Sequence, residues 1–283
     1  VAMTHYNFMS IFAWNIFLYT GFFAIVALYL WTLFERRMNG HTERAGLLAF
    51  FWRLTLTTGT GSILGFLVAR DAYHSALLAP LFIIMSFSFG LAIFVLVLMA
   101  ACRWTGRPLG DVVLRRLKNL LGVFVGAVLY FVAIHHLTNL YIARQHDVER
   151  FFLLEGGIYT ALFWLGQILV GSLLPLALLF SPALNRSRRA VSVAAACVIL
   201  GALAQLYVLI IGGQAYPQMM FPDKHVSSSF FDGVVAAYTP SLPEIALGVG
   251  GVALALALTA VALKVLPFLP QSLADSDAEP DAA

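Results

Sequence analysis

The chain has 283 residues, of which 61% are hydrophobic and 11% are charged. This balance excludes an ordinary soluble protein, in which about 45–50% apolar and about 25% charged residues are usual. A net charge of +3 and a pI of about 9.0 would suggest nucleic-acid binding in a soluble chain. Here the basic residues lie in short segments between apolar runs, so we expect a membrane protein with lipid, and no nucleic acid, as its surroundings.

Seven apolar segments are each long enough to cross a bilayer as a helix. They are residues 8–34, 45–69, 76–102, 119–141, 156–180, 190–212 and 245–269. We therefore predict an all-α integral membrane protein, a polytopic helical bundle with a single transmembrane domain over residues 1–270. Residues 271–283 contain four acidic and no aromatic residues, which predicts a disordered acidic cytoplasmic tail. Because the first ten residues contain no Lys or Arg, we expect the first helix to be retained rather than cleaved.

Basic residues are distributed unevenly between two alternating sets of loops. The richer set has twelve: Arg36, Arg37, Arg44, Arg103, Arg107, Arg115, Arg116, Lys118, Arg186, Arg188, Arg189 and Lys264. The poorer set has four: Arg70, Arg144, Arg150 and Lys224. Since basic loops stay in the cytoplasm, we expect a multi-pass protein of a bacterial or archaeal cytoplasmic membrane, with its N-terminus outside and its C-terminus inside.

Ionisable and aromatic polar residues gather at the helix ends that this orientation places outside. They are Arg70, Asp71, His74, His135, His136, Tyr141, Glu155 and Tyr159. Charged groups are costly in a membrane and are functional candidates by default, so we predict one polar pocket near the outer face. His135 and Asn139 share a helix face and His136 points about 100° away, so we expect only one histidine to face any single site.

Several of these residues also have a simpler explanation. His135 and His136 would serve as interfacial hydrogen-bonding or anchoring residues, Arg70 and Asp71 would form a surface ion pair of little energetic value, and Glu155 would be a helix-start carboxylate favoured by the helix dipole. The sequence alone leaves these alternatives open.

A second set of polar residues is a candidate proton path. Its members are Arg53, Thr57, Thr60, Gln167 and Glu244. The alternatives are that Arg53 extends toward the nearby inner surface, and that the threonines and Gln167 hold helices together by close packing and hydrogen bonding.

The sequence offers few ligands for a redox centre of its own. Cys102 and Cys197 are too few for an iron–sulfur cluster, which typically needs four cysteines, and no C-x-x-C-H motif for covalent haem attachment is present. The embedded histidines lie on the predicted outer side only, which argues against a haem relay across the bilayer. We expect no metal site, no haem and no iron–sulfur cluster, with a single outer haem b as an alternative.

Several stretches together resemble the NrfD/PsrC family of quinone-interacting membrane subunits. They are LTLTTGTGSILGFLVARDAY from Leu54, APLFIIMSFSFGLA from Ala79, HLTNLY from His136, FLLEGGIYTALFWLGQILVGSLLPLALL from Phe152, and GGQAYP with FFDGVVAAYTPSLPE ending at Glu244. Within the family, the pattern is most similar to the DsrP-like branch, found in the membrane complex of dissimilatory sulfite metabolism. The chain departs from the family in two respects. Fewer helices are visible than is usual, and Trp14 is followed by Asn15 where Asp or Gly is common.

The resemblance implies a fold built around two four-helix bundles and a quinone pocket near the periplasmic side. The cofactor would be menaquinone or ubiquinone, and the partner a periplasmic ferredoxin-like iron–sulfur subunit. Seven positions match the polar groups of family pockets: Arg70, Asp71, His74, His136, Tyr141, Glu155 and Tyr159. We thus expect a quinol/quinone-binding subunit of a respiratory oxidoreductase, coupled to proton movement, with sulfur metabolism as its setting. The alternatives are a secondary transporter with an outward-side pocket and a haem b anchor.

Overall fold

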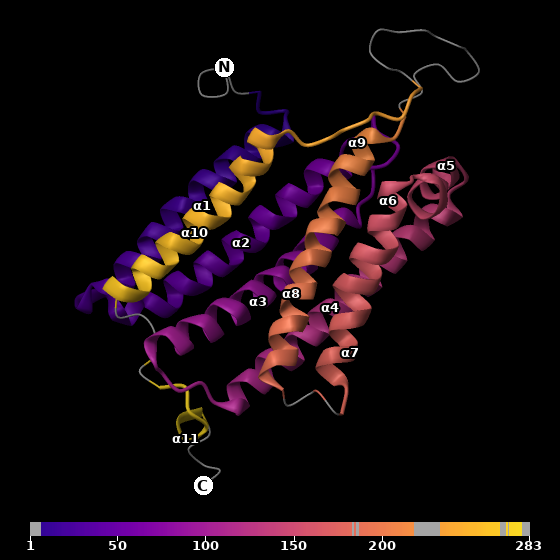
Figure 1. Ribbon diagram of the computed structural model, residues 1–283. Coiled ribbons are helices and arrows are strands. Elements are labelled where there is room, and N and C mark those ends of the chain that lie inside the picture. The colour runs from indigo at the N-terminus through magenta and orange to yellow at the C-terminus, as the bar shows by residue number, and fades with distance from the viewer. Residues whose placement is uncertain are drawn as a thin grey trace. The chain divides into compact units, whose positions relative to one another are not determined.

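The computed structural model describes residues 7–182, 184, 187–217, 233–266, 270 and 272–278. Their regular structure is helical (Figure 1), with no strand among them and one isolated bridge between Leu109 and Leu273. The prediction of an all-α protein is confirmed. Arg186 and Lys224, which entered the orientation argument, lie outside the described residues, as do residues 271 and 279–283 of the predicted tail.

The chain divides into two compact units. The first comprises Val1–Phe87 and Ala127–Arg150, and the second comprises Ser88–Gly126 and Phe151–Ala283. The long helices α3 (Leu78–Thr105) and α4 (Asp111–Tyr141) each contribute to both units. Each unit is described by itself below.

The first unit begins with a helical hairpin. Helices α1 (Ile11–Phe34) and α2 (Thr42–Gly65) run side by side (Figure 1), joined by the 3-10 helix η1 (Arg36–His41). The Thr42 hydroxyl donates to the Thr32 carbonyl (3.1 Å) near the turn, and Trp52 Nε1 donates to the Leu18 carbonyl (2.8 Å) further along. Contacts in this order require antiparallel helices. Gly21 makes the approach possible, because a Cβ there would overlap the Trp52 indole ring.

The remainder of the first unit includes a segment that contacts the far end of α2. It contains the first part of α3, the last part of α4, the 3-10 helix η2 (Ala143–Gln145) and α5 (His146–Arg150). Gly61 of α2 touches the start of α3, since a Cβ there would lie 2.8 Å from Ala79 Cα. The loop between α2 and α3 is thereby held close to α2.

The second unit contains three π-helical stretches among its α-helices. Its elements after the parts of α3 and α4 are η3 (Phe151–Glu155), α6 (Ile158–Ala161), η4 (Leu162–Leu173), α7 (Leu174–Phe180), α8 (Arg188–Leu206), η5 (Tyr207–Gly212), α9 (Gly213–Ala215), α10 (Leu242–Val265) and α11 (Asp275–Ala278). The π-helical stretches are η3, η4 and η5.

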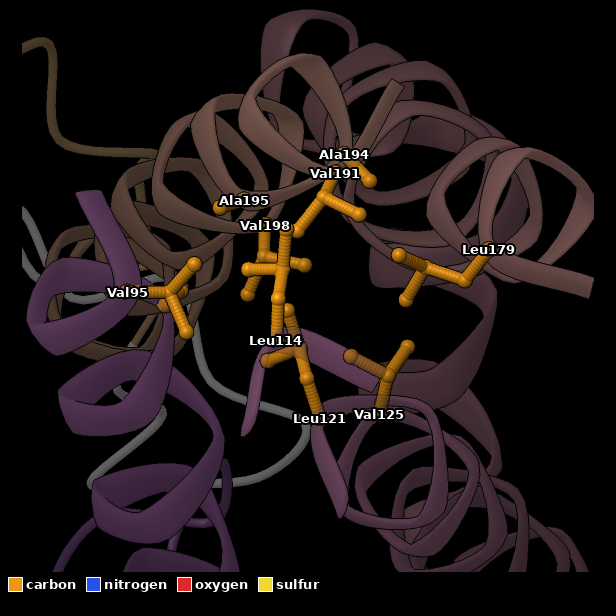
Figure 2. Packing of buried hydrophobic residues seen from close by; sticks show 10 residues of the cluster. Val95, Leu114, Leu121, Val125, Leu179, Val191, Ala194, Ala195 and Val198 are labelled. Carbon is orange, nitrogen blue, oxygen red and sulfur yellow. The ribbon is translucent and has the colours of Figure 1, made fainter. Parts of the chain in front are cut away.

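The core of the second unit is formed by aliphatic side chains from α3, α4 and α7 that pack against valine and alanine residues of α8 (Figure 2). It consists of Ala92, Val95, Leu114, Leu121, Val125, Leu179, Val191, Ala194, Ala195 and Val198. Further along α8, Gly201 faces Gly171 of η4 so closely that a Cβ on Gly201 would overlap the Gly171 Cα atom. Small residues of this kind let membrane helices pack backbone to backbone.

Six helical segments among the described residues are long and apolar enough to cross a membrane. They are Ile11–Phe34, Leu78–Thr105, Asp111–Tyr141, Ile158–Phe180, Arg188–Ala215 and Leu242–Val265. The chain is therefore a polytopic integral membrane protein, but the predicted count of seven spans is not confirmed. The predicted span 45–69 forms α2, which has the required length. Its central Arg53 and its several threonines make it too polar to qualify by composition.

The loop between α3 and α4 is held by two distant segments of the second unit. Arg188 Nη2, at the start of α8, donates to Asp111 Oδ1 (2.7 Å) and to the Leu109 carbonyl (2.6 Å). Leu273 exchanges backbone hydrogen bonds with the residues flanking Leu109 (2.6 and 3.1 Å). Asp275 Oδ1 accepts from the backbone N–H of residue 112 (2.8 Å) and so caps α4. Residues 272–278 of the predicted tail thus contact this loop.

Candidate functional site

A buried polar network lies where α4 meets α5 in the first unit. His136 Nδ1 lies 2.6 Å from Glu149 Oε2, and Asn139 Nδ2 donates to Glu149 Oε1 at 2.8 Å. Asn139 Nδ2 also lies 3.3 Å from His135 Nε2. The Glu149 side chain is only 1% exposed, so its carboxylate depends on these partners rather than on water.

Both histidines join this one network, contrary to the expectation that only one would face a single site. The two side chains do diverge around the helix. Glu149 contacts His136 directly, and the Asn139 amide connects Glu149 to His135. Because the Asn139 amide donates to His135, the neutral His135 ring accepts at Nε2 and carries its proton on Nδ1. His135 Nδ1 is buried without a hydrogen-bond partner.

A pocket with a volume of about 450 Å³ adjoins this network. Its lining residues come from the α2–α3 loop and from the end of α4 with η2: Val68, Asp71, His74, Ser75, Ala76, Leu77, Thr138, Asn139, Ile142, Arg144 and Gln145. Small-molecule sites commonly have about 300–1,000 Å³ of space and combine apolar walls with a few polar groups. This pocket meets both conditions.

Two features of the pocket wall point to ligand binding. Gln145 is buried, and its Oε1 atom has no hydrogen-bond partner, which is costly unless a bound molecule supplies a donor. His74 has a φ of 56°, the only positive φ outside glycine among the described residues. Such a backbone conformation is strained, and strain of this kind concentrates at functional sites.

An ion pair joins the two walls of the pocket. Arg144 Nη2 donates to Asp71 Oδ1 at 2.8 Å, although Arg144 follows Asp71 by 73 residues in the chain. Both side chains are partly open to solvent, at 75% and 35% exposure, so the pair contributes little stability. The Arg144–Asp71 pair mainly positions the two walls, because it keeps the α2–α3 loop next to η2.

The structure distributes the predicted site residues unevenly. Asp71 and His74 line the pocket, while His135 and His136 lie in the network that reaches it through Asn139. Arg70 precedes Asp71 in the same loop, where its N–H donates to the Leu67 carbonyl (3.2 Å). Tyr141 is 91% exposed and does not line the pocket.

Glu155 and Tyr159 belong to the second unit. Tyr159 is buried in a group of aromatic rings, with its centroid 5.7 Å from that of Phe151 and 6.1 Å from that of Tyr207. Gly212 leaves room for this group, because a Cβ there would lie 3.1 Å from the Tyr159 ring. Glu155 is exposed at the end of η3.

The candidate proton-path residues do not form one chain of contacts within either unit. In α2, the Thr57 and Thr60 hydroxyls donate to the carbonyls of Arg53 (2.9 Å) and Leu56 (3.0 Å), one turn earlier in the same helix. In the second unit, Gln167 is buried within η4. Glu244 Oε2 accepts from the Ser241 N–H (2.7 Å) and so begins α10 with a capping box.

Sequence reasoning missed the acid at the centre of the network. Glu149 follows Gln145 and Val148 at the i, i+3, i+4 spacing of one helix face, and all three are buried. This periodicity could have identified Glu149, but the segment of charged residues around it is also typical of an outer loop. Gln145 was missed as well, because a single polar residue in a loop indicates no function until its surroundings are known. Asn139 was recognised only as a residue on the same helix face as His135.

A second pocket of about 710 Å³ lies between α1 and α2. Its walls are mainly apolar, but Asn15 contributes a buried Oδ1 without a hydrogen-bond partner. Across the described residues, no group of three or more His, Cys, Asp and Glu side chains is arranged to hold a metal ion.

Apolar spans and a polar pocket at their ends define the class of the molecule, a helical integral membrane protein with room for a small ligand. A model of the polysulphide reductase NrfD family matches residues 1–218. The chain belongs to this family, as its resemblance to NrfD/PsrC sequences predicted.

Curated relatives carry names from several respiratory systems. The chain is 30% identical to the Hdr-like menaquinol oxidoreductase integral membrane subunit of Archaeoglobus fulgidus, over 95% of this chain and 68% of that protein. It is 25% identical to a selenate reductase subunit of Mesobacillus selenatarsenatis, over 74% of this chain and 47% of that protein. It is 26% identical to a putative dimethyl sulfoxide reductase membrane subunit of Halobacterium salinarum, over 99% of this chain and 69% of that protein. No solved structure matches the chain significantly.

Proposed function

We propose that the chain is a quinone-binding membrane subunit of a respiratory oxidoreductase complex, with its head-group site in the 450 Å³ pocket of the first unit. One observation carries the proposal. The pocket combines an apolar wall with the buried and unpartnered Gln145 Oε1 atom, and a protonatable imidazole and a carboxylate line the same space. Family membership and the menaquinol oxidoreductase named among the relatives support the same class.

The residues of the pocket suit the chemistry of this ligand. Quinol oxidation releases two protons together with two electrons, so a head-group site needs hydrogen-bond acceptors and groups that take up protons. Gln145 Oε1 and the Asp71 carboxylate would accept hydrogen bonds from hydroxyl groups. His74 is exposed and can take up a proton and return it to water. Val68, Leu77 and Ile142 provide an apolar surface for the ring.

The buried network would keep this site in place. Asn139 lines the pocket and donates to Glu149, which also holds His136, so the end of α4 and α5 are fixed together. Preorganised polar groups bind a ligand with a smaller loss of conformational freedom. We assign these three residues a positioning role and the pocket residues a binding role.

The finer parts of the proposal rest on the sequence resemblance. The site would face the periplasm and exchange electrons with a ferredoxin-like iron–sulfur subunit, and the complex would act in sulfur or sulfite metabolism. Proton movement through Arg53, Thr57, Thr60, Gln167 and Glu244 stays a prediction of the sequence.

Direct ligand titration tests the proposed site. The purified subunit in lipid nanodiscs is titrated with menaquinone and, separately, with ubiquinone in their reduced forms, and binding is followed by quenching of tryptophan fluorescence. We expect saturable binding that Gln145→Leu weakens by about fivefold, the equivalent of a hydrogen bond worth about 1 kcal/mol. Leu137→Ala is the control, because Leu137 is 61% exposed on the preceding helix α4 and does not line the pocket.

Two results would contradict the proposal. Absence of saturable binding would contradict the proposed quinone-binding function. Binding that Gln145→Leu leaves unchanged would contradict the proposed location of the site. Uptake of a polar solute by the subunit alone, without any response to quinone, would support the transporter alternative. A haem absorbance band in the purified subunit would support the anchor alternative.

A further inference from the structure

Arg53 lies at the middle of the α1–α2 hairpin. Its guanidinium carbon is 5.4 Å from the centroid of the Phe22 ring. Phe22 is at the centre of α1, a 24-residue segment apolar enough to span a membrane, and Arg53 is at the centre of the equally long α2. Since the two helices run antiparallel along their whole length, Arg53 is at the mid-depth of the bilayer that α1 crosses.

At this depth the side chain cannot reach water along the helix. Arg53 is about 17 Å along the axis from Thr42 and about 18 Å from Gly65, at a rise of about 1.5 Å per residue. The hydrocarbon core is about 30 Å thick, and an extended arginine side chain covers only part of the remaining half. Simple extension toward the interface therefore leaves its charge within the hydrocarbon.

The charge of Arg53 also lacks a counter-ion among the described residues. A guanidinium has five N–H donors and is not deprotonated in proteins, so it cannot shed its charge. Within the ranges that the structure describes, Arg53 has no carboxylate at ion-pair distance, and its recorded partner is the face of Phe22. An aromatic face attracts the cation but accepts none of the N–H donors in the plane of the group.

One large apolar side chain lies on the same side of α2 as the charge. Phe50, one helical turn before Arg53, is 46% exposed, its ring centroid lies 6.3 Å from that of Phe87, and Arg53 is exposed beside it. We call this surface, formed by Phe50 and Arg53, the Arg53 face. It would suit lipid except for one permanent positive charge, which is costly in hydrocarbon unless it is paired.

We propose that the Arg53 face binds a transmembrane helix of a partner subunit, and that a carboxylate at the mid-depth of this helix pairs with Arg53. Charge complementarity selects this occupant. Lipid phosphates lie at the membrane surface, too far from mid-depth. A second copy of residues 1–283 does not fit either, because none of the seven predicted spans within them contains an Asp or Glu. A helix from a different polypeptide can bring a carboxylate to this depth.

Purification of the intact complex tests the proposal. The complex is isolated from its native membranes through a tag on this subunit, and the amount of each membrane-embedded partner is measured by quantitative mass spectrometry. We expect Arg53→Gln to reduce recovery of one membrane-embedded partner at least tenfold, and Arg53→Lys to retain most of it. Arg44→Gln, which removes the same charge at the start of the same helix, should change nothing.

A crosslinking experiment identifies the helix without altering Arg53. A photoreactive phenylalanine analogue replaces Phe50, and the complex is irradiated in its membranes. We expect a crosslink to a membrane-spanning segment whose Asp or Glu lies within about one helical turn of the attachment point. Exchanging the charges, with Arg53→Asp here and an arginine in place of that acid, should restore the recovery of the partner.

Three outcomes would overturn the proposal. They are unchanged partner recovery in a normally inserted Arg53→Gln subunit, crosslinks to lipid alone, and a crosslinked span without an acid. Where Arg53→Gln fails to insert, the Phe50 crosslink decides by itself. Quinone binding by the isolated subunit is a separate measurement, so failure here leaves the proposed head-group site standing.

Discussion

Two contacts between a basic and an acidic side chain, of nearly equal length, illustrate how differently the same kind of contact acts in two places. His136 Nδ1 and Glu149 Oε2 are 2.6 Å apart, and Arg188 Nη2 and Asp111 Oδ1 are 2.7 Å apart. The first pair has side-chain exposures of 18% and 1%, whereas the second has 49% and 77%. Water screens the Arg188–Asp111 pair and can solvate both side chains when the pair breaks. The Glu149 side chain is buried, so water cannot replace its partners in the same way.

The difference teaches that burial, and not distance, determines what each pair contributes. Removing one partner of a buried pair leaves a charge without solvation, which is strongly destabilising. An exposed pair contributes about 0–1 kcal/mol at most. The exposed contact still has a use, because Arg188 also holds the Leu109 carbonyl and so orients the loop before α4.

The largest effect is expected when the buried pair is broken from the histidine side. His136→Ala leaves the Glu149 carboxylate with only the Asn139 amide, at a cost of about 3–5 kcal/mol in the free energy of unfolding. Unfolding by sodium dodecyl sulfate, followed by circular dichroism, measures this cost. His146→Ala is the matched control, because His146 is exposed in the neighbouring helix. Equal stability of the two variants would show that burial does not distinguish these sites.

A glycine pair extends the comparison from charge to packing. Gly201→Ala would drive a methyl group into the backbone of η4, and overpacking of this kind costs about 1–3 kcal/mol. Gly126→Ala is the matched control, since a Cβ there meets nothing within 4 Å. Thermal unfolding in detergent, followed by size-exclusion fluorescence, compares them. A Gly201→Ala variant as stable as Gly126→Ala would contradict the close approach of η4 and α8.

The smallest effect is expected at the exposed pair. Asp111→Asn removes its charge but keeps an oxygen that can accept from Arg188, so we expect a loss of about 0–1 kcal/mol. Added salt should reduce the difference between this variant and the parent protein, because exposed charges are screened. Unfolding by sodium dodecyl sulfate at two salt concentrations measures both effects. A loss of unfolding free energy as large as that of His136→Ala would show that the exposed pair contributes as much stability as the buried pair.

Sequence reasoning predicted the helices better than it predicted the site. Long apolar runs identify spans because lipid requires an apolar surface over a fixed length. The helix α2 has this length but is not among the six candidate spans, because it contains polar residues whose cost in lipid depends on their partners. Asp71 and His74, which the sequence predicts as quinone-site residues, line the 450 Å³ pocket, and their role there stays a prediction. The partners of Glu149 depend on the turn between α4 and α5, and no residue pattern specifies how that turn brings one carboxylate to the His136 and Asn139 side chains.

The contact between the C-terminal segment and the α3–α4 loop has a practical consequence for protein production. Shortening the chain before residue 270 would remove the Asp275 cap from the first turn of α4 and the backbone pairing around Leu109. Expression trials that trim this polar end to improve crystallisation would therefore loosen a long helix at its base.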